Sequence, residues 1–169
     1  PFEPHLNDFR HALEIAEILD TKYIRLFSFL IDDGDNPYDF TDEVLERLSV
    51  FKDEAKGSGI VLLHENEKRI YGSVPERCKI IADELYSADF RLIFDPANFI
   101  ECGVEAYPHA FNMLVDYIEY MHIKDCRKSD KIVVPSGMGD GHIREILMEL
   151  KRRNYSGFLS LEPHLADYV

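Results

Sequence analysis

The chain has 169 residues, 46% of them hydrophobic, and its 19 lysines and arginines against 32 aspartates and glutamates give a formal net charge of −13. These values suit one soluble globular domain, and so acidic a surface repels phosphate backbones and anionic lipids, which argues against a nucleic-acid or membrane-surface protein. There is no apolar run near the ~18 residues that cross a bilayer and no visible targeting signal, and three widely spaced cysteines without a CxxC pair indicate a reducing, cytoplasmic setting.

Segments typical of helices alternate with apolar runs typical of strands buried on both faces. In chain order we expect a helix over 7–19, a strand over 23–29, a helix over 41–57, a strand over 60–65, a helix over 73–86, a strand over 90–95, a helix over 108–117, a strand over 118–124, a helix over 141–153 and a strand over 158–162. This alternation indicates right-handed βαβ units around a parallel sheet, so the predicted class is α/β.

Four of the five predicted strands end on side chains that bind metals, namely Glu65, Asp95, His122 and Glu162. The ligand site of a parallel α/β fold lies at the carboxyl ends of its strands, so we expect these side chains on one rim. Any one of these residues could be an acid exposed to solvent or a histidine bonded to a backbone carbonyl. Four such residues at consecutive strand ends favour a functional ligand site. Three carboxylates and an imidazole suit one Mn²⁺, Mg²⁺, Co²⁺ or Zn²⁺ ion.

Residues near these strand ends are candidates for contacts with a substrate. Side chains two apart on a strand share a face, which brings Lys124 and His164 to the side of the predicted ligands and, as a weaker candidate, Glu67. Arg127 lies where it can meet a substrate anion. The predicted substrate-binding residues are Lys124, Arg127, His164 and Asn98.

Residues 137–141, with the sequence GMGDG, have the composition of a phosphate-binding loop. They lie a dozen residues past their strand and lack the GxGxxG and P-loop patterns. We therefore favour a loop that lines the mouth of the site over a nucleotide site. Asp125 stays open as an additional carboxylate for a second metal ion.

Five motifs resemble, in their order, the sugar phosphate isomerase/epimerase family of xylose isomerase-like TIM barrels, also labelled AP endonuclease family 2. They are HENE (64–67), FDPAN (94–98), HIKD (122–125), PSGMGD (135–140) and LEPH (161–164). The resemblance implies a (β/α)₈ TIM barrel of which the five strands are strands four to eight, so residues 1–169 would be a single domain, the C-terminal portion of a barrel. A complete barrel takes ~250 residues, and we expect the chain to be part of a longer protein.

The resemblance also implies a chemistry. In that family the four strand-end residues bind one divalent metal ion, and the two glutamates, here Glu65 and Glu162, are acid/base residues in the epimerase members. A metal ion that polarises a carbonyl acidifies the neighbouring C–H and stabilises an enediolate. We therefore expect a metal-dependent isomerase or epimerase that works by proton transfer on a small sugar or sugar phosphate, without nucleic-acid or membrane partners, and with a homo-oligomer as a further expectation.

Two alternatives remain open. A zinc-dependent apurinic/apyrimidinic endonuclease-like hydrolase uses related ligands, but it needs more histidines and a basic DNA-facing rim, which a net charge of −13 opposes. A relative that binds a sugar or metal without catalysis is the other. Many family members have a histidine where this chain has Glu67, and the ketose 3-epimerases have one where it has Asn98, so the motifs leave the substrate open.

Overall fold

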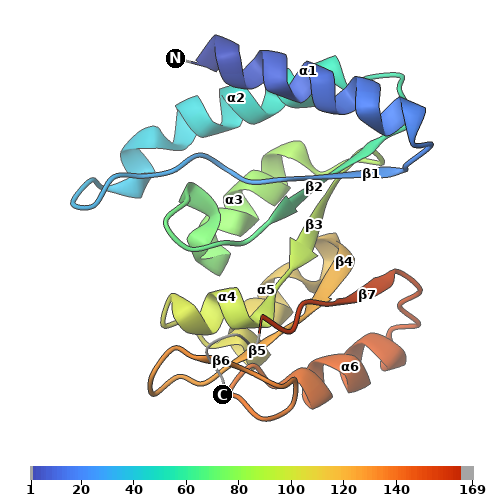
Figure 1. The fold of residues 1–169 in the computed structure, drawn as a ribbon. Coiled ribbons are helices and arrows are strands. Elements are labelled where there is room, and N and C mark those ends of the chain that lie inside the picture. The colour runs from blue at the N-terminus through green and yellow to red at the C-terminus, as the bar shows by residue number, and fades with distance from the viewer. Residues whose placement is uncertain (1, 165–169) are drawn as a thin grey trace.

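Five parallel strands form one curled sheet in the computed structural model, which describes residues 2–164 (Figure 1). The order in space is the order along the chain: β1 (Tyr23–Leu26), β2 (Val61–Glu65), β3 (Phe90–Phe94), β4 (Ile118–Ile123) and β7 (Phe158–Leu161). Every neighbouring pair in this sheet is parallel. The predicted strands and the α/β class are thus confirmed, and the curl of the sheet makes half of a barrel.

Helices cover the outside of the curl or, in the case of the short helix that follows β3, its rim (Figure 1). They are α1 (Phe2–Ile18), α2 (Thr41–Glu54), α3 (Pro75–Leu85), α4 (Pro96–Glu101), α5 (Phe111–Leu114) and α6 (Ile143–Arg152). The helix predicted over 108–117 is instead three short turns, because a π-helical turn over Ala106–Ala110 and a 3₁₀ turn over Val115–Tyr117 flank α5. Within residues 2–164, the structure has no helix that is long and apolar enough to cross a bilayer.

One helix and one β-hairpin of the structure are absent from the sequence-based prediction. The six-residue helix α4 follows β3 at once, and the strands β5 (Asp125–Cys126) and β6 (Val133–Val134) form an antiparallel hairpin after β4. Both lie beyond the carboxyl ends of the strands. They therefore build the rim on which the predicted site lies.

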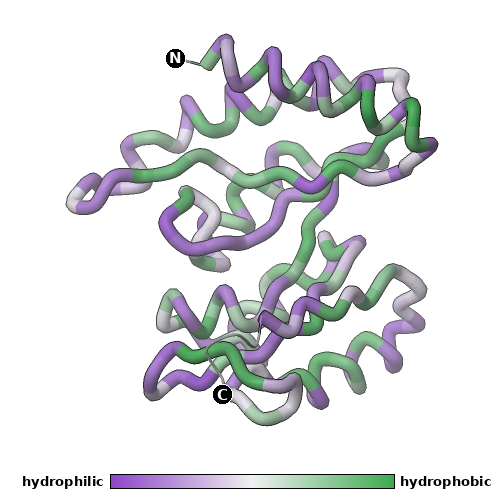
Figure 2. The backbone as a smooth tube through the Cα atoms, viewed as in Figure 1, coloured by the Kyte–Doolittle hydropathy of each residue, from purple (hydrophilic) through white to green (hydrophobic). Residues whose placement is uncertain are grey.

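Strand alternation divides the apolar side chains between two faces of the sheet. Leu62 and Leu92 pack in the large clusters formed with the helices, whereas Val61, Leu63 and Ile93 form a small cluster on the inner face. Figure 2 shows hydrophobic residues along β2 and β3 and hydrophilic residues through the loop that follows β2. Since side chains two apart share a face, Glu65 at the end of β2 and Asp95 directly after β3 point to the inner side as well.

Candidate metal centre

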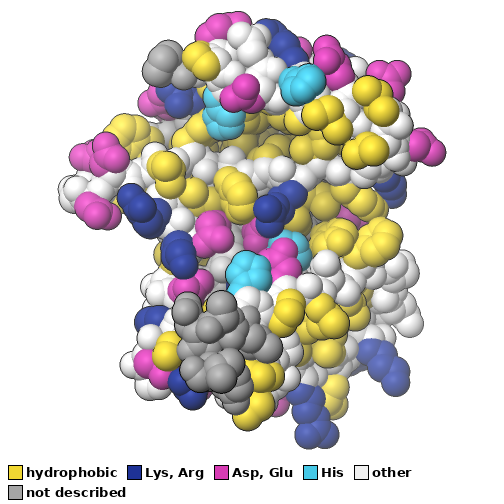
Figure 3. All heavy atoms as spheres, viewed as in Figure 1, with side chains coloured by type: hydrophobic (Ala, Val, Ile, Leu, Met, Phe, Trp, Pro, Cys, Tyr) yellow, Lys and Arg dark blue, Asp and Glu magenta, His cyan; other side chains and the backbone are white. Residues whose placement is uncertain are grey.

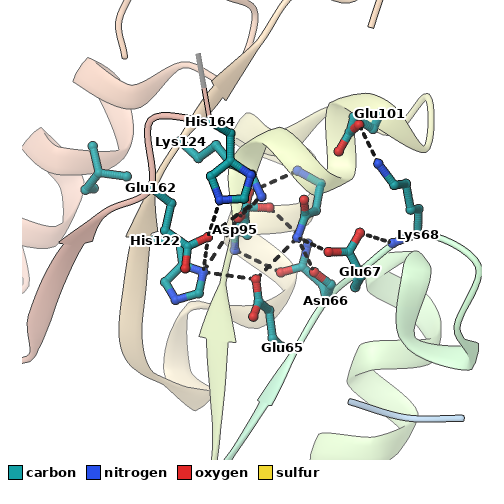
Figure 4. Close-up of polar contacts among 12 residues, drawn as sticks. Glu65, Asn66, Glu67, Lys68, Asp95, Glu101, His122, Lys124, Glu162 and His164 are labelled. Carbon is teal, nitrogen blue, oxygen red and sulfur yellow. Dashed lines mark hydrogen bonds and ion pairs between the residues drawn. The ribbon is translucent and has the colours of Figure 1, made fainter. Parts of the chain in front are cut away.

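The four predicted ligands meet at the carboxyl ends of β2, β3, β4 and β7. One ligand atom from each of Glu65, Asp95, His122 and Glu162 lies within 4.8 Å of the others. His122 Nδ1 is 2.9 Å from Glu65 Oε1. The same nitrogen is 3.6 Å from Asp95 Oδ2 and 3.5 Å from Glu162 Oε2 (Figure 4). One donor from each of four neighbouring strands thus converges on a volume that one ion can fill.

Asp95 shows how the local fold leaves a ligand atom free. Its Oδ1 accepts the backbone N–H of Asn98 at 3.0 Å and caps α4. Its Oδ2 is buried and lies 2.8 Å from Lys124 Nζ as an ion pair, yet among the described residues no hydrogen bond is directed at it. Buried polar atoms are nearly always hydrogen-bonded, so an oxygen left in this state fits a metal ligand.

The carboxylates of the cluster create a negative environment that favours a bound positive charge. Burial acts to lower the pKa of His122, but the neighbouring carboxylates of Asp95, Glu65 and Glu162 outweigh it and raise that pKa to about 9. The imidazole is therefore protonated at neutral pH when no metal is bound. Three carboxylates held this close repel one another unless cations lie among them.

Arg25, which the sequence analysis did not single out, supplies one of these cations. Its Nη1 lies 3.0 Å from Glu65 Oε2 and 3.8 Å from Glu162 Oε1. Its guanidinium also lies over the ring of Phe27, 5.0 Å from the centroid. A charged residue inside the otherwise apolar run of 23–29 is the signal that could have identified it.

Two asparagines, Asn66 and Asn98, fix the positions of predicted ligands through hydrogen bonds. Asn66 exchanges two 2.9 Å hydrogen bonds with the backbone of Asp95, which ties the end of β2 to the end of β3. Asn98, a predicted substrate contact, is buried, and its Nδ2 donates to the Asn66 carbonyl at 2.9 Å and to Glu65 Oε1 at 3.3 Å. The same amide reaches Glu67 Oε2 at 3.4 Å. Such partners orient metal ligands.

The other predicted substrate contacts divide into two groups. Lys124 is buried beside the centre, and His164 Nε2 lies 3.9 Å from Glu162 Oε2. Arg127 is not brought to the centre, because its guanidinium pairs with Asp130 at 2.8 Å on the turn between β5 and β6. A short hairpin that the strand pattern did not predict directs this side chain away from the ligands.

The glycine-rich segment 137–141 binds an anion from within the chain. The carboxylate of Asp125 is buried and accepts the N–H groups of Gly137 at 2.8 Å, Gly139 at 3.0 Å and Gly141 at 2.8 Å. It also accepts the N–H of Cys126 at 2.9 Å. These bonds occupy both oxygens of Asp125, which the sequence left open as a carboxylate for a second metal ion, and the same amides are not free to bind a phosphate.

Two cavities adjoin the centre. One of about 440 Å³ lies on the inner face of the sheet and reaches His122 and Glu162, and another of about 390 Å³ lies toward α4 and the β5–β6 hairpin. Figure 3 shows acidic, basic and histidine side chains gathered at the middle of this face, with hydrophobic side chains on either side. Cavities of this size suit a small molecule.

Comparison with known proteins identifies the architecture. Residues 3–167 match the family described as xylose isomerase-like TIM barrel. A D-tagatose 3-epimerase-like protein is 23% identical over 94% of this chain and 62% of its own, with a TM-score of 0.77. The probable 3-DHS dehydratase AsbF from Bacillus anthracis is 18% identical over 96% of this chain and 64% of its own, with a TM-score of 0.80.

A third similar structure is that of the IOLI protein with a binding zinc atom. It is 18% identical over 96% of this chain and 61% of its own, with a TM-score of 0.80. At such identities the likeness concerns the fold alone, and the chain spans about three-fifths of the length of these proteins. Among curated proteins, no sequence matches.

Proposed function

The chain belongs to the xylose isomerase-like TIM barrel family, and from this premise we propose that it is a divalent-metal-dependent isomerase or epimerase of a small sugar or sugar phosphate. The observation that carries the proposal is the convergence of Glu65, Asp95, His122 and Glu162 within 4.8 Å at the strand ends. Residues 1–169 are, in this proposal, one domain equivalent to strands four to eight of a barrel. The epimerase-like protein of similar fold supports the reaction class.

The donor set fits one divalent ion such as Mn²⁺, Mg²⁺, Co²⁺ or Zn²⁺. Three hard carboxylates and one imidazole converge, and Asp95 Oδ2, which is ion-paired with Lys124, lies 3.6 Å from the imidazole nitrogen of His122. When bound, such an ion polarises a carbonyl and stabilises the negative charge that develops beside it. The zinc atom of the IOLI structure supports an ion of this kind.

Glu65 and Glu162 are the proposed acid and base. They come from β2 and β7, on opposite sides of the β4 residue His122, so they can approach a bound sugar from two directions. Glu65 is buried and is held by hydrogen bonds from Asn98 and His122, whereas the side chain of Glu162 is 22% exposed at the wall of the inner cavity. One carboxylate would remove the proton beside the carbonyl and the other would return it.

Arg25 contacts both proposed acid/base residues. Its guanidinium lies within 4 Å of both glutamates, at 3.0 and 3.8 Å. A cation at this distance favours the ionised form of a carboxylate. Arg25 thus offsets negative charge beside both glutamates.

The test is exchange of the substrate C–H in D₂O. Metal-free protein is reconstituted with Mg²⁺ and incubated with a panel of ketoses and ketose phosphates, and the proton beside the carbonyl is followed by ¹H NMR. We expect exchange that requires the metal and is lost in Glu65→Gln and Glu162→Gln, but not in the exposed control Asp116→Asn. Exchange that persists in both glutamine variants refutes the acid/base assignment, and absence of exchange across the panel favours a non-catalytic binding protein.

A further inference from the structure

The cavity of about 390 Å³ beside the metal centre has a lining unlike the rest of the molecule. Three lysines, Lys68, Lys124 and Lys131, and two glutamates, Glu67 and Glu101, line it. In the whole chain the acidic residues outnumber the lysines and arginines by 32 to 19. Three lysines and two glutamates thus face one cavity beside the candidate centre, in a chain that is acidic overall.

The three lysines differ in what they contact. Lys68 Nζ pairs with Glu101 Oε1 at 2.9 Å, and Lys124 pairs with Asp95. Lys131 donates to the backbone carbonyl of Ile100, and no carboxylate of residues 2–164 lies within ion-pair distance of its ammonium. An ammonium has three donors, so Lys131, which is exposed and makes one bond, keeps two donors for water or for a ligand in the cavity.

We propose that this cavity binds an oxyanion carried by the substrate, a phosphate ester or a carboxylate, with Lys131 as its main cation. The proposal rests on the proposed function, since the reacting end of the same molecule would lie at the metal centre. Lys124 lies between the cavity and the metal centre, because it lines the cavity and contacts Asp95. A substrate with a sugar end and an anionic end would span them.

This arrangement discriminates between substrates. A neutral sugar leaves the remaining Lys131 donors to water, whereas an oxyanion gains a charge-assisted hydrogen bond from them. Sites built to pair a polar group reject analogues that lack it. We therefore expect an anionic ketose to bind roughly tenfold tighter than its neutral counterpart, as one such bond is worth on that order.

Binding of small anions to the metal-free protein tests the cavity apart from the centre. Inorganic phosphate and acetate are titrated into chelator-treated protein by calorimetry, with Lys131→Gln as the test variant and Lys128→Gln, an exposed lysine of the same turn, as the control. We expect the test variant to weaken phosphate or acetate binding about tenfold, the control to leave it unchanged and Lys131→Arg to restore it. Equal affinity in all variants, or no binding of either anion, overturns the proposal.

Three ketoses then distinguish the two sources of the oxyanion. Binding of D-fructose, D-fructose 6-phosphate and D-fructuronate is compared in metal-loaded wild-type and Lys131→Gln protein. Preference for the phosphate or for the carboxylate, lost in the variant, supports the proposal and names the group, and equal affinity for all three overturns it. If no ketose shows C–H exchange while Lys131 still governs anion binding, the proposed function fails and the anion site stands.

Discussion

His122 Nδ1 lies 2.9 Å from Glu65 Oε1, although the two residues are 57 positions apart in the chain. The bond forms because β2 and β4 flank β3 and all three end at one rim. In the metal-free protein the imidazolium occupies the place of a cation among the carboxylates. A metal ion that binds there must displace its proton.

Metal affinity should therefore rise with pH. The carboxylates around His122 raise its pKa to about 9 against the lowering effect of burial, so the ring is protonated at pH 7 and must lose that proton to bind an ion. We expect the Kd for Zn²⁺ or Mn²⁺ to fall about tenfold per pH unit between pH 6 and 8. Calorimetry in buffers of different ionisation enthalpy should show release of about one proton per ion, and a pH-independent Kd would contradict this account.

Acid should destabilise the protein through His64. This residue is fully buried beside Ser28 and Gly72, and burial lowers its pKa to about 3. The unfolded chain binds the proton more tightly, so stability is present above pH 6.5 and is lost as the pH falls toward 3. Between pH 6.5 and 5 the free energy of unfolding should fall by about 2 kcal/mol from this group.

Urea denaturation at several pH values measures this contribution. His64→Gln should flatten the acid limb of the stability profile, and His11→Gln, on the exposed face of α1, should leave it unchanged. An acid limb that is equally steep in all three proteins would show that His64 does not titrate as the structure indicates.

Removal of the Asp125 carboxylate should loosen the loop over 137–141. This carboxylate is buried and accepts hydrogen bonds from the backbone N–H groups of three glycines, 12, 14 and 16 residues further along the chain. Asp125→Ala leaves these donors unpaired and should cost about 3–5 kcal/mol of unfolding free energy. Chemical denaturation measures this loss, with Asp130→Asn on the exposed turn as a control that should leave stability nearly unchanged.

Asn66 should matter for metal affinity although it is not a ligand. Its two hydrogen bonds to Asp95 fix the backbone from which that proposed ligand projects. Asn66→Ala should weaken metal binding roughly 10- to 100-fold, the range observed for partners of metal ligands. Asn112→Ala, exposed on α5, should bind metal as the wild type does, and equal Kd values for both variants would contradict a positioning role for Asn66.

The sequence allowed prediction of features that depend on local pattern. Apolar runs predicted all five strands of the sheet, and the rule that parallel strands end on one rim predicted that Glu65, Asp95, His122 and Glu162 meet. No pairing information was needed, because each of these side chains lies at or next to the carboxyl end of its strand and so reaches the same edge.

The features that the sequence did not reveal depend on tertiary contacts. Helix α4 has only six residues, too few for a recognisable apolar period, and begins where Asp95 caps it. The role of Asp125 depends on glycines that the β5–β6 hairpin folds back onto it. Arg25 acts on Glu65 only because β1 pairs with β2.

Titration of the metal-free protein with Mn²⁺, followed by electron paramagnetic resonance, tests the central claim most directly. We expect one Mn²⁺ per chain in the wild type, at least 100-fold weaker binding in Asp95→Ala and in His122→Ala, and wild-type binding in Asp116→Asn, since each ligand lost from a four-donor site removes a large share of its affinity. Absence of bound Mn²⁺ in the wild type, or equal binding by all four proteins, would contradict a metal centre built by these residues.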